Sequence, residues 1–238
     1  AGKYEGRAEN FIPKIRNWLD EQKEKAEVGT IVPEDPPHFW SETAMRVRQT
    51  LILLKHTRRM GMIYGGAGVG KTLTARAVQE THNEVFIATL KAIDSNARST
   101  LQRIASEIGI TGNNQEHYSR RIFQNICSRL TSNSLLIVDE AQHTDIKAID
   151  AIRAIHDDVG CGLVLIGNNP LHRIVFGDAS GQLAQLHSRI AICIQIDRPT
   201  DKDITELCHQ WKVPPGKAAD EIRVIAREPG GLRSASNC

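Results

Sequence analysis

The sequence lacks any long apolar run and any large excess of one charge. No apolar stretch approaches the roughly 20 residues that cross a bilayer, and the opening segment AGKYEGRAEN has none of the apolar character of a signal peptide. Thirty Lys and Arg against 28 Asp and Glu give a formal net charge of +2. We therefore expect a soluble, cytoplasmic chain in which any basic surface is local, because the net charge gives little attraction for nucleic acid.

Cysteine is also scarce and irregularly placed. The five cysteines form no CxxC pair and show no spacing with histidine that suits a metal. This pattern favours reduced thiols, most of them in the core. Of the 238 residues, 40% are apolar, which is enough for one sizeable core and a small second domain.

Short apolar stretches rich in β-branched residues alternate with helical patterns. The stretches are GMIYG (61–65), EVFIATL (84–90), SLLIVDE (134–140), GLVLIGN (162–168) and IAICIQI (190–196). Strands that are apolar along their whole length, separated by helices, are typical of a parallel sheet covered on both faces. The sequence therefore predicts a doubly wound α/β core with five parallel strands, preceded by a helix over residues 41–58.

The flanking segments predict the domain organisation. Residues 10–25 place apolar side chains at helical spacing, so we expect an N-terminal helical segment over 1–26. Residues 27–37, EVGTIVPEDPP, are rich in proline and acid and predict a linker. The α/β core is expected over 38–198. Residues 199–238 turn helical again and predict a small helical lid, which we expect to be truncated.

A phosphate-binding motif follows the first predicted strand. GGAGVGKT fits G-x-x-x-x-G-K-[ST] in full and stands between a strand and a helix, where the mechanism requires it. Glycines allow backbone N–H groups to surround phosphate oxygens, Lys71 is expected to pair with the β and γ phosphates, and Thr72 to bind Mg²⁺. A turn that binds nothing is the weaker reading in this context. The predicted ATP-binding residues are Gly65, Gly66, Ala67, Gly68, Val69, Gly70, Lys71, Thr72 and Leu73.

Three polar residues end the later strands. Asp139 and Glu140 close the apolar run LLIV, and we expect Asp139 to serve Mg²⁺ and Glu140 to polarise the attacking water. Asn168 ends the next strand, where it can touch the γ-phosphate or that water. The competing readings are an exposed acidic turn and an asparagine that only serves the turn before Pro170.

Two arginines are candidates for completing the site. Arg189 lies just before the fifth strand and can be an arginine finger that reaches the γ-phosphate of a neighbouring subunit. Arg233, in GGLRS, can sense nucleotide from the lid of the same subunit. Each is also compatible with a plain surface arginine.

Cationic and polar residues also gather near the expected loops and helix starts. Phosphate binding by DNA-binding proteins needs such a local stripe rather than a high net charge. Taken singly, most of these residues are equally compatible with solvated helix faces. The predicted DNA contacts are Thr89, Lys91, Arg98, Arg103, Arg120, Arg121 and Lys147.

Together these motifs resemble an AAA+ ATPase. The segments IVDEAQHTD, GLVLIGNNPL, LHSRIA and EPGGLR are similar, in order and spacing, to the MuB family of phage Mu transposition regulators and more distantly to TnsC and IstB. The start, GKYEG and the helix after it, resembles the tail of that family's N-terminal helix-turn-helix domain. Gln142 stands where an acid often follows DEA, which we expect to matter little because Asp139 and Glu140 already fill the metal and water roles.

The resemblance implies a function and a role for each motif. It implies ATP bound with Mg²⁺ between adjacent subunits, a helical filament on double-stranded DNA without strong sequence preference, and delivery of that DNA to a transposase. Hydrolysis is implied to disassemble the filament. Asp139 and Glu140 become the Walker B pair, Asn168 sensor 1, Arg189 the finger and Arg233 sensor 2. The alternatives are a helicase-loader-like replication ATPase, a nucleotide-gated switch with little turnover and, least suited, a small-molecule kinase.

Overall fold

The computed structural model describes residues 12–31, 36, 38–110, 119–177 and 184–237. The chain divides into two compact units, residues 1–37 and 38–238. In the first unit, helix α1 (Ile12–Ile31) continues through residues 27–31, which we expected in the linker. The segment EVGTI contains no proline before Pro33, so nothing breaks the helix earlier. The start of the expected N-terminal helical segment, including GKYEG, lies outside the described residues.

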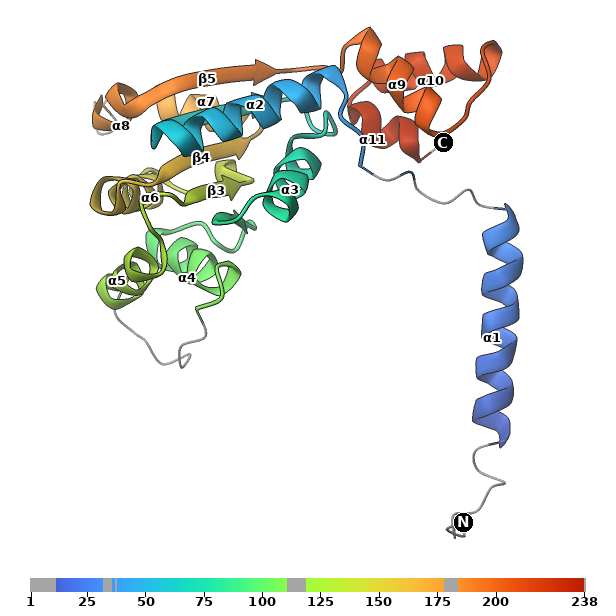
Figure 1. Cartoon of the computed structure of the whole chain (residues 1–238), viewed down its shortest axis with the longest axis horizontal. Helices are drawn as coiled ribbons and strands as arrows, with labels where there is room; N and C mark the ends of the chain where they lie inside the picture. Colours follow the sequence, from blue (N-terminus) through green and yellow to red (C-terminus); the bar gives the residue numbers. More distant parts are fainter. Residues whose placement is uncertain (1–11, 32–35, 37, 111–118, 178–183, 238) are drawn as a thin grey trace, which may run out of the picture. The chain divides into compact units, whose positions relative to one another are not determined.

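The second unit is built on five parallel strands in the order β2-β3-β4-β1-β5 (Figure 1). This arrangement confirms the predicted fold class. Strands β1, β3 and β4 are buried along their whole length, which explains their unbroken apolar sequence, whereas β2 and β5 form the edges. The strands are β1 (Met60–Gly65), β2 (Val85–Thr89), β3 (Leu135–Asp139), β4 (Gly162–Gly167) and β5 (Ile190–Ile196).

Helices cover both faces of this sheet. On one face, α2 and α3 pack through a cluster that includes Leu51, Val78 and Ile137. On the other, α4 to α7 pack through a cluster that includes Ile104, Ile152 and further strand side chains. The helices of the core are α2 (Glu42–Thr57), α3 (Lys71–Thr81), α4 (Ala97–Glu107), α5 (Ser119–Arg129), η2 (Ala141–His143), α6 (Ile146–Val159), α7 (Asn169–Phe176) and α8 (Ala184–Arg189).

The strand order decides which loops meet. β4 lies between β3 and β1, so the loops that follow β1, β3 and β4 leave one edge of the sheet side by side. In parallel α/β sheets ligands bind at this carboxyl edge. The strands follow from the sequence but this order does not, because it depends on the two connections that skip strands, β1 to β2 and β4 to β5.

Three short helices form the lid, and a buried carboxylate joins it to the core. α9 (Asp201–Gln210), α10 (Lys217–Arg227) and α11 (Gly231–Ser236) share a small apolar cluster. Asp203 is fully buried and accepts hydrogen bonds from the backbone N–H of Thr43 (2.9 Å), the hydroxyl of Thr43 and the backbone N–H of Thr200 (2.8 Å). Burial pushes the pKa of Asp203 up, but these hydrogen bonds outweigh burial and hold the pKa below its ordinary value.

The cysteines among the described residues carry free thiols. Burial raises the pKa of Cys127 and of Cys161 to about 11, so both thiols stay protonated and unreactive at neutral pH. In the described part of the chain, no helix combines the length and apolar character needed to span a membrane.

Candidate functional site

The glycine-rich loop between β1 and α3 has a backbone that only glycine adopts easily. Gly68 and Gly70 have φ values of +76° and +92°, and Gly65 has +135°. A Cβ on Gly65 would lie 2.1 Å from the carbonyl oxygen of Ile196 on β5. Turns of this kind direct successive N–H groups toward an anion, and the N-terminal end of α3 adds its positive dipole.

Lys71, the first residue of α3, is buried beside this loop. Its ammonium donates hydrogen bonds to the carbonyl oxygens of Gly65 (3.1 Å) and Gly66 (2.6 Å). Burial lowers the pKa of Lys71, while the charges of Glu140 and Asp139 oppose that shift. The loop therefore keeps a poorly solvated cation next to the place where phosphate oxygens would bind.

Thr72 and Asp139 already contact each other. The hydroxyl of Thr72 donates to Oδ2 of Asp139 at 2.8 Å, and Oδ1 accepts from the backbone N–H of Glu140 at 3.0 Å. Burial raises the pKa of Asp139, and these two hydrogen bonds oppose the rise. A hydroxyl and a carboxylate at hydrogen-bond distance are the hard oxygen ligands that Mg²⁺ prefers, so these two residues fit that ion. Leu73, the next residue, is exposed.

Glu140, Gln142 and Asn168 form a chain across the ends of β3 and β4. Glu140 is a non-glycine residue with φ of +54°, and its carboxylate accepts a hydrogen bond from Nε2 of Gln142. Oε1 of the same amide accepts from the backbone N–H of Asn168 at 3.1 Å. The side chain of Asn168 does not cap α7, which weakens the reading that it only serves the turn. The contacts of Gln142 could not be predicted from the sequence, because its partner on β4 depends on the strand order.

The lid brings Arg233 to the same loop. The backbone N–H of Arg233 lies 3.4 Å from the carbonyl oxygen of Gly68, and the charge of Arg233 contributes to lowering the pKa of Lys71. The lack of a side chain at Gly68 makes this approach possible, because a Cβ there would lie 1.8 Å from the carbonyl oxygen of Gly230. α11 therefore lies directly against the glycine-rich loop.

Arg189 lies away from this site. It precedes Ile190, which pairs with Met60 at the start of β1, whereas the glycine-rich loop follows the other end of β1. Six residues of strand separate the two ends, about 20 Å at the usual rise. Nε of Arg189 donates to Oδ1 of Asp157 at 2.6 Å, and the same carboxylate also contacts Arg153. Within one chain, Arg189 therefore stands at the opposite edge of the sheet.

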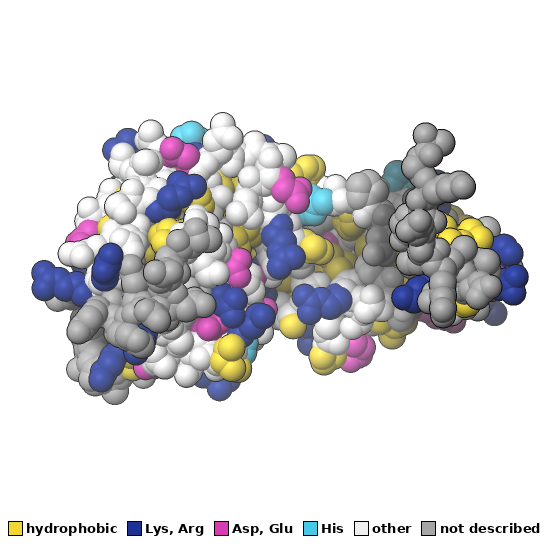
Figure 2. All heavy atoms as spheres, turned by 90° about the horizontal axis from the view of Figure 1, so that it is seen from below, with side chains coloured by type: hydrophobic (Ala, Val, Ile, Leu, Met, Phe, Trp, Pro, Cys, Tyr) yellow, Lys and Arg dark blue, Asp and Glu magenta, His cyan; other side chains and the backbone are white. Residues whose placement is uncertain are grey.

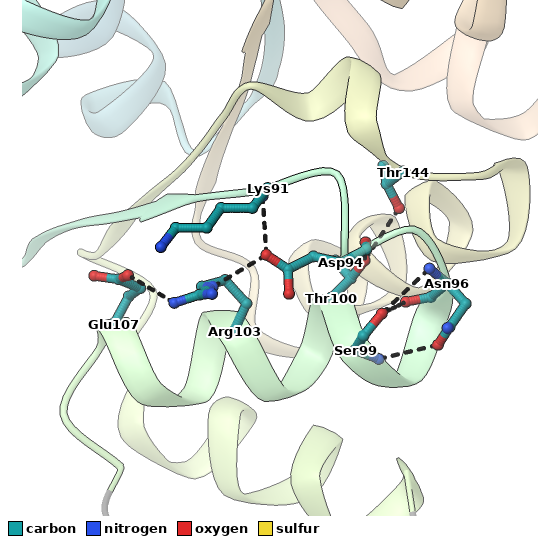
Figure 3. A network of polar contacts seen from close by, with 8 residues as sticks. All are labelled: Lys91, Asp94, Asn96, Ser99, Thr100, Arg103, Glu107 and Thr144. Carbon is teal, nitrogen blue, oxygen red and sulfur yellow. Dashed lines mark hydrogen bonds and ion pairs between the residues drawn. The ribbon is translucent and has the colours of Figure 1, made fainter.

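The predicted DNA contacts begin at a braced loop that follows β2. Thr89 is the last residue of β2 and is in register with Asp139. In the loop, the buried carboxylate of Asp94 accepts from the backbone N–H of Lys91 (2.9 Å) and from Nε of Arg103 (3.1 Å), as Figure 3 shows. Arg103 also pairs with Glu107 at 3.6 Å. Arg103 thus braces the loop, while Lys91 is exposed on it.

The remaining predicted contacts are exposed at helix starts. The hydroxyl of Thr100 in α4 lies 3.1 Å from the hydroxyl of Thr144, just before α6. This contact holds the start of α4 next to the start of α6, where Lys147 lies. Arg98 lies in the first turn of α4, and Arg120 and Arg121 lie in the first turn of α5. On the face that Figure 2 shows, basic side chains form separate groups among acidic and uncharged ones. Lys91 thus lies on the loop after β2, whereas Arg98 and Lys147 lie in the first turns of α4 and α6.

Comparison with known proteins finds a matching family model and several similar proteins. A family model described as "AAA domain" matches residues 54–175. The chain is 27% identical to the ATP-dependent target DNA activator B of Escherichia phage Mu, over 97% of this chain and 73% of that protein. It is 28% identical to the Mu-like prophage FluMu DNA transposition protein B of Haemophilus influenzae, over 97% of this chain and 80% of that protein.

A solved structure shares the fold. The Aeropyrum pernix ORC2 protein, in ADPNP and ADP complexes, superposes with a TM-score of 0.62 at 17% identity, over 85% of this chain. The match covers 61% of that protein, less than two thirds of its length. The curated relatives confirm the predicted resemblance to Mu transposition regulators. The shared fold confirms the predicted α/β architecture.

Proposed function

We propose, from the premise that this chain belongs to the AAA domain family, that it is a Mg²⁺-dependent ATPase that presents target DNA to a transposase. The observation that carries the proposal is the meeting of four side chains at one edge of the sheet. Lys71 lies in the glycine-rich loop, Thr72 contacts Asp139, and Glu140 follows at the end of β3. These residue types and positions are those that phosphoryl transfer to water requires.

Each residue has a distinct task in this reaction. Lys71 and the loop N–H groups bind the β and γ phosphates, while Thr72 and Asp139 hold Mg²⁺. The ion would neutralise charge that develops on the phosphate oxygens. Glu140 orients and polarises the attacking water, and Asn168 contacts the γ-phosphate from the neighbouring strand end. Arg233 approaches the nucleotide from the lid.

The place of Arg189 favours a site shared between copies. Arg189 and the glycine-rich loop lie at opposite edges of one sheet, so Arg189 can approach a γ-phosphate only in a neighbouring copy. An arginine finger supplied in trans stabilises transition-state charge. We propose that copies stack into a helical filament with ATP at each interface, and that hydrolysis releases the contact and disassembles the filament.

DNA and a transposase are the proposed partners. The names "target DNA activator" and "DNA transposition protein" of the two relatives support both. The exposed cations Lys91, Arg98 and Lys147, on the segments that follow β2 and β3, support contact with the phosphate backbone of duplex DNA, which carries no sequence preference. Because the proposed partners are DNA and ATP, the proposed location is the cytoplasm or nucleoid of the bacterial host.

The test of turnover is Glu140→Gln. The amide keeps the shape of the side chain but cannot polarise water, so ATP hydrolysis should fall at least about 100-fold while nucleotide affinity stays. Steady-state phosphate release and titration with a fluorescent ATP analogue measure the two quantities. Glu221→Gln, on the exposed face of α10, is the matched control and should behave as the parent. Equal rates in the Glu140 variant and the parent would remove Glu140 as the catalytic carboxylate.

The same variant tests assembly. With ATP bound and turnover blocked, Glu140→Gln should form filaments on duplex DNA of unrelated sequences, visible by electron microscopy. The parent protein should also form filaments with ATP, and adding the transposase should shorten the filaments of the parent. Closed rings or monomers at saturating protein would favour the helicase-loader alternative instead.

A further inference from the structure

One side chain joins the ends of β3 and β4, and no step of the proposed hydrolysis uses it. Gln142 lies in η2, where its amide nitrogen donates to Glu140 and its amide oxygen accepts from the backbone N–H of Asn168. A single side chain thus contacts both the carboxylate proposed to act on water and the backbone of the residue proposed to touch the γ-phosphate.

The backbone on both sides is shaped around this amide. Glu140 has a left-handed φ of +54°, which turns the chain into η2 and brings residue 142 back toward β4. On β4, a Cβ at Gly167 would lie 2.5 Å from Oε1 of Gln142. A larger residue at 167 would therefore displace the amide from Asn168.

The position needs a side chain that donates and accepts at once. A neutral carboxamide does both, because its nitrogen carries two protons and its oxygen two lone pairs. A carboxylate could still accept from Asn168 but could not donate to Glu140, and it would place two negative charges side by side. Gln142 therefore makes both contacts, of which the acid that often follows DEA could make only one.

We propose that Gln142 is a positioning residue for ATP hydrolysis, which fixes the direction of the Glu140 carboxylate and couples it to the strand end that carries Asn168. This inference rests on the proposed ATPase function. A movement of Asn168 toward the γ-phosphate is passed through the amide to Glu140, so the water-activating group is aligned when nucleotide is in place. Gln142 contacts the carboxylate rather than the glycine-rich loop, so its loss affects turnover and not nucleotide affinity.

Two variants reach the same amide by different routes. Gln142→Glu keeps the size and the acceptor but removes the donor to Glu140, and Gly167→Ala pushes an unchanged Gln142 aside. We expect kcat to fall by about 10- to 100-fold in both, since a small misplacement near the reacting atoms has effects of this size. The affinity for a fluorescent ATP analogue should remain that of the parent. Gln210→Glu is the matched control, because Gln210 also donates to a carboxylate, Glu206, at 2.7 Å on α9.

A second measurement needs no nucleotide. The unfolding free energies of Glu140→Ala, Gln142→Ala and the double variant form a cycle in urea, and a direct contact predicts that the two effects are not additive. Parental kcat in both Gln142→Glu and Gly167→Ala, or an additive cycle, would overturn the inference while the parent still hydrolyses ATP. Loss of affinity in step with kcat would also overturn it, because that result indicates general disruption of the site. A parent without ATPase activity would overturn the proposed function itself.

Discussion

Lys71 is a residue that we expect to favour nucleotide binding at a cost in the free energy of unfolding. Its ammonium is buried and held by the carbonyl oxygens of Gly65 and Gly66, and burial lowers its pKa. A lysine whose pKa is lower in the folded chain destabilises the fold while its ammonium is protonated. The free energy of unfolding therefore increases as pH rises from the folded pKa toward the pKa of the unfolded chain. The charge is kept because the phosphate needs it.

Lys71→Met is therefore expected to separate the two properties. Methionine fills the space without the charge, so nucleotide binding should be lost while the unfolding free energy of the nucleotide-free protein rises by about 1 kcal/mol at pH 7. Titration with a fluorescent ATP analogue and urea denaturation measure these effects. Lys217→Met, at an exposed position on α10, serves as the control. A large loss of stability in the Lys71 variant would show that its hydrogen bonds outweigh the cost of burial.

At this scale the sequence predicted residues that stand in a strict motif or at the end of an apolar run. Lys71 and Thr72 were identified because the glycine-rich motif fixes their spacing, and Asp139 because it ends an apolar run. Gln142 and Asp157 gave no such signal. Their partners, Asn168 and Arg189, lie 26 and 32 residues away, and only the packing of β4 and β5 brings them into contact.

Among the elements, the contact between α2 and α9 connects core and lid. Asp203 at the start of α9 accepts hydrogen bonds from Thr43 at the start of α2, 160 residues earlier. Asp203→Asn keeps the shape but turns an amide N–H toward these donors, so we expect a loss of about 2 to 3 kcal/mol of unfolding free energy. Thermal and urea denaturation measure it, and Asp220→Asn on the exposed face of α10 is the control.

The pH dependence of this contact has a definite sign. The folded pKa of Asp203 is held below its ordinary value, so its contribution is present above the unfolded pKa of about 4 and is lost as pH falls through the folded value. The gap in stability between the parent and Asp203→Asn should therefore be constant from pH 7 to about 5 and narrow below about 4. A gap that stays the same in acid would show that the charge of Asp203 contributes nothing.

Element boundaries were predicted better than element order. Apolar runs located all five strands to within one residue, because strands buried on both faces have unbroken apolar sequence. The order β2-β3-β4-β1-β5 could not be predicted, since it depends on which crossover skips which strand. The predicted end of α1 was wrong. The linker over 27–37 was predicted from its proline and acid content, but residues 27–31 contain no proline and continue the helix.

For the whole molecule, sites completed by a neighbour predict complementation between inactive variants. Arg189→Ala should bind ATP but lack the proposed finger, and Lys71→Met should keep the finger but not bind ATP. When the two variants are mixed on DNA, some interfaces should combine the intact nucleotide site of Arg189→Ala with the intact Arg189 of Lys71→Met. The ATPase rate of the mixture should then exceed the sum of the separate rates. A rate equal to that sum would place the action of Arg189 within its own chain or outside catalysis.

The proposed DNA binding is also tested at the scale of the whole molecule. A net charge of +2 gives little long-range attraction, so affinity should depend on local contacts such as Lys91 and Arg98. Replacing both with Ala should weaken binding equally across sequences and reduce the slope of log K against log salt by about 2. The control pair is Lys217→Ala with Arg223→Ala on α10. An unchanged slope would exclude both residues as phosphate contacts.

The separation of Arg189 from the glycine-rich loop has a consequence for stoichiometry. If Arg189 of one copy meets the glycine-rich loop of the next, as we propose, a two-fold symmetric dimer cannot satisfy both ends of a copy, so the proposed growth is head to tail. In an open chain of n copies only n − 1 nucleotides are fully enclosed, and one terminal copy always keeps an incomplete site. The ATPase rate per copy should then rise with the number of copies as (n − 1)/n. The two ends of such a filament would be chemically different.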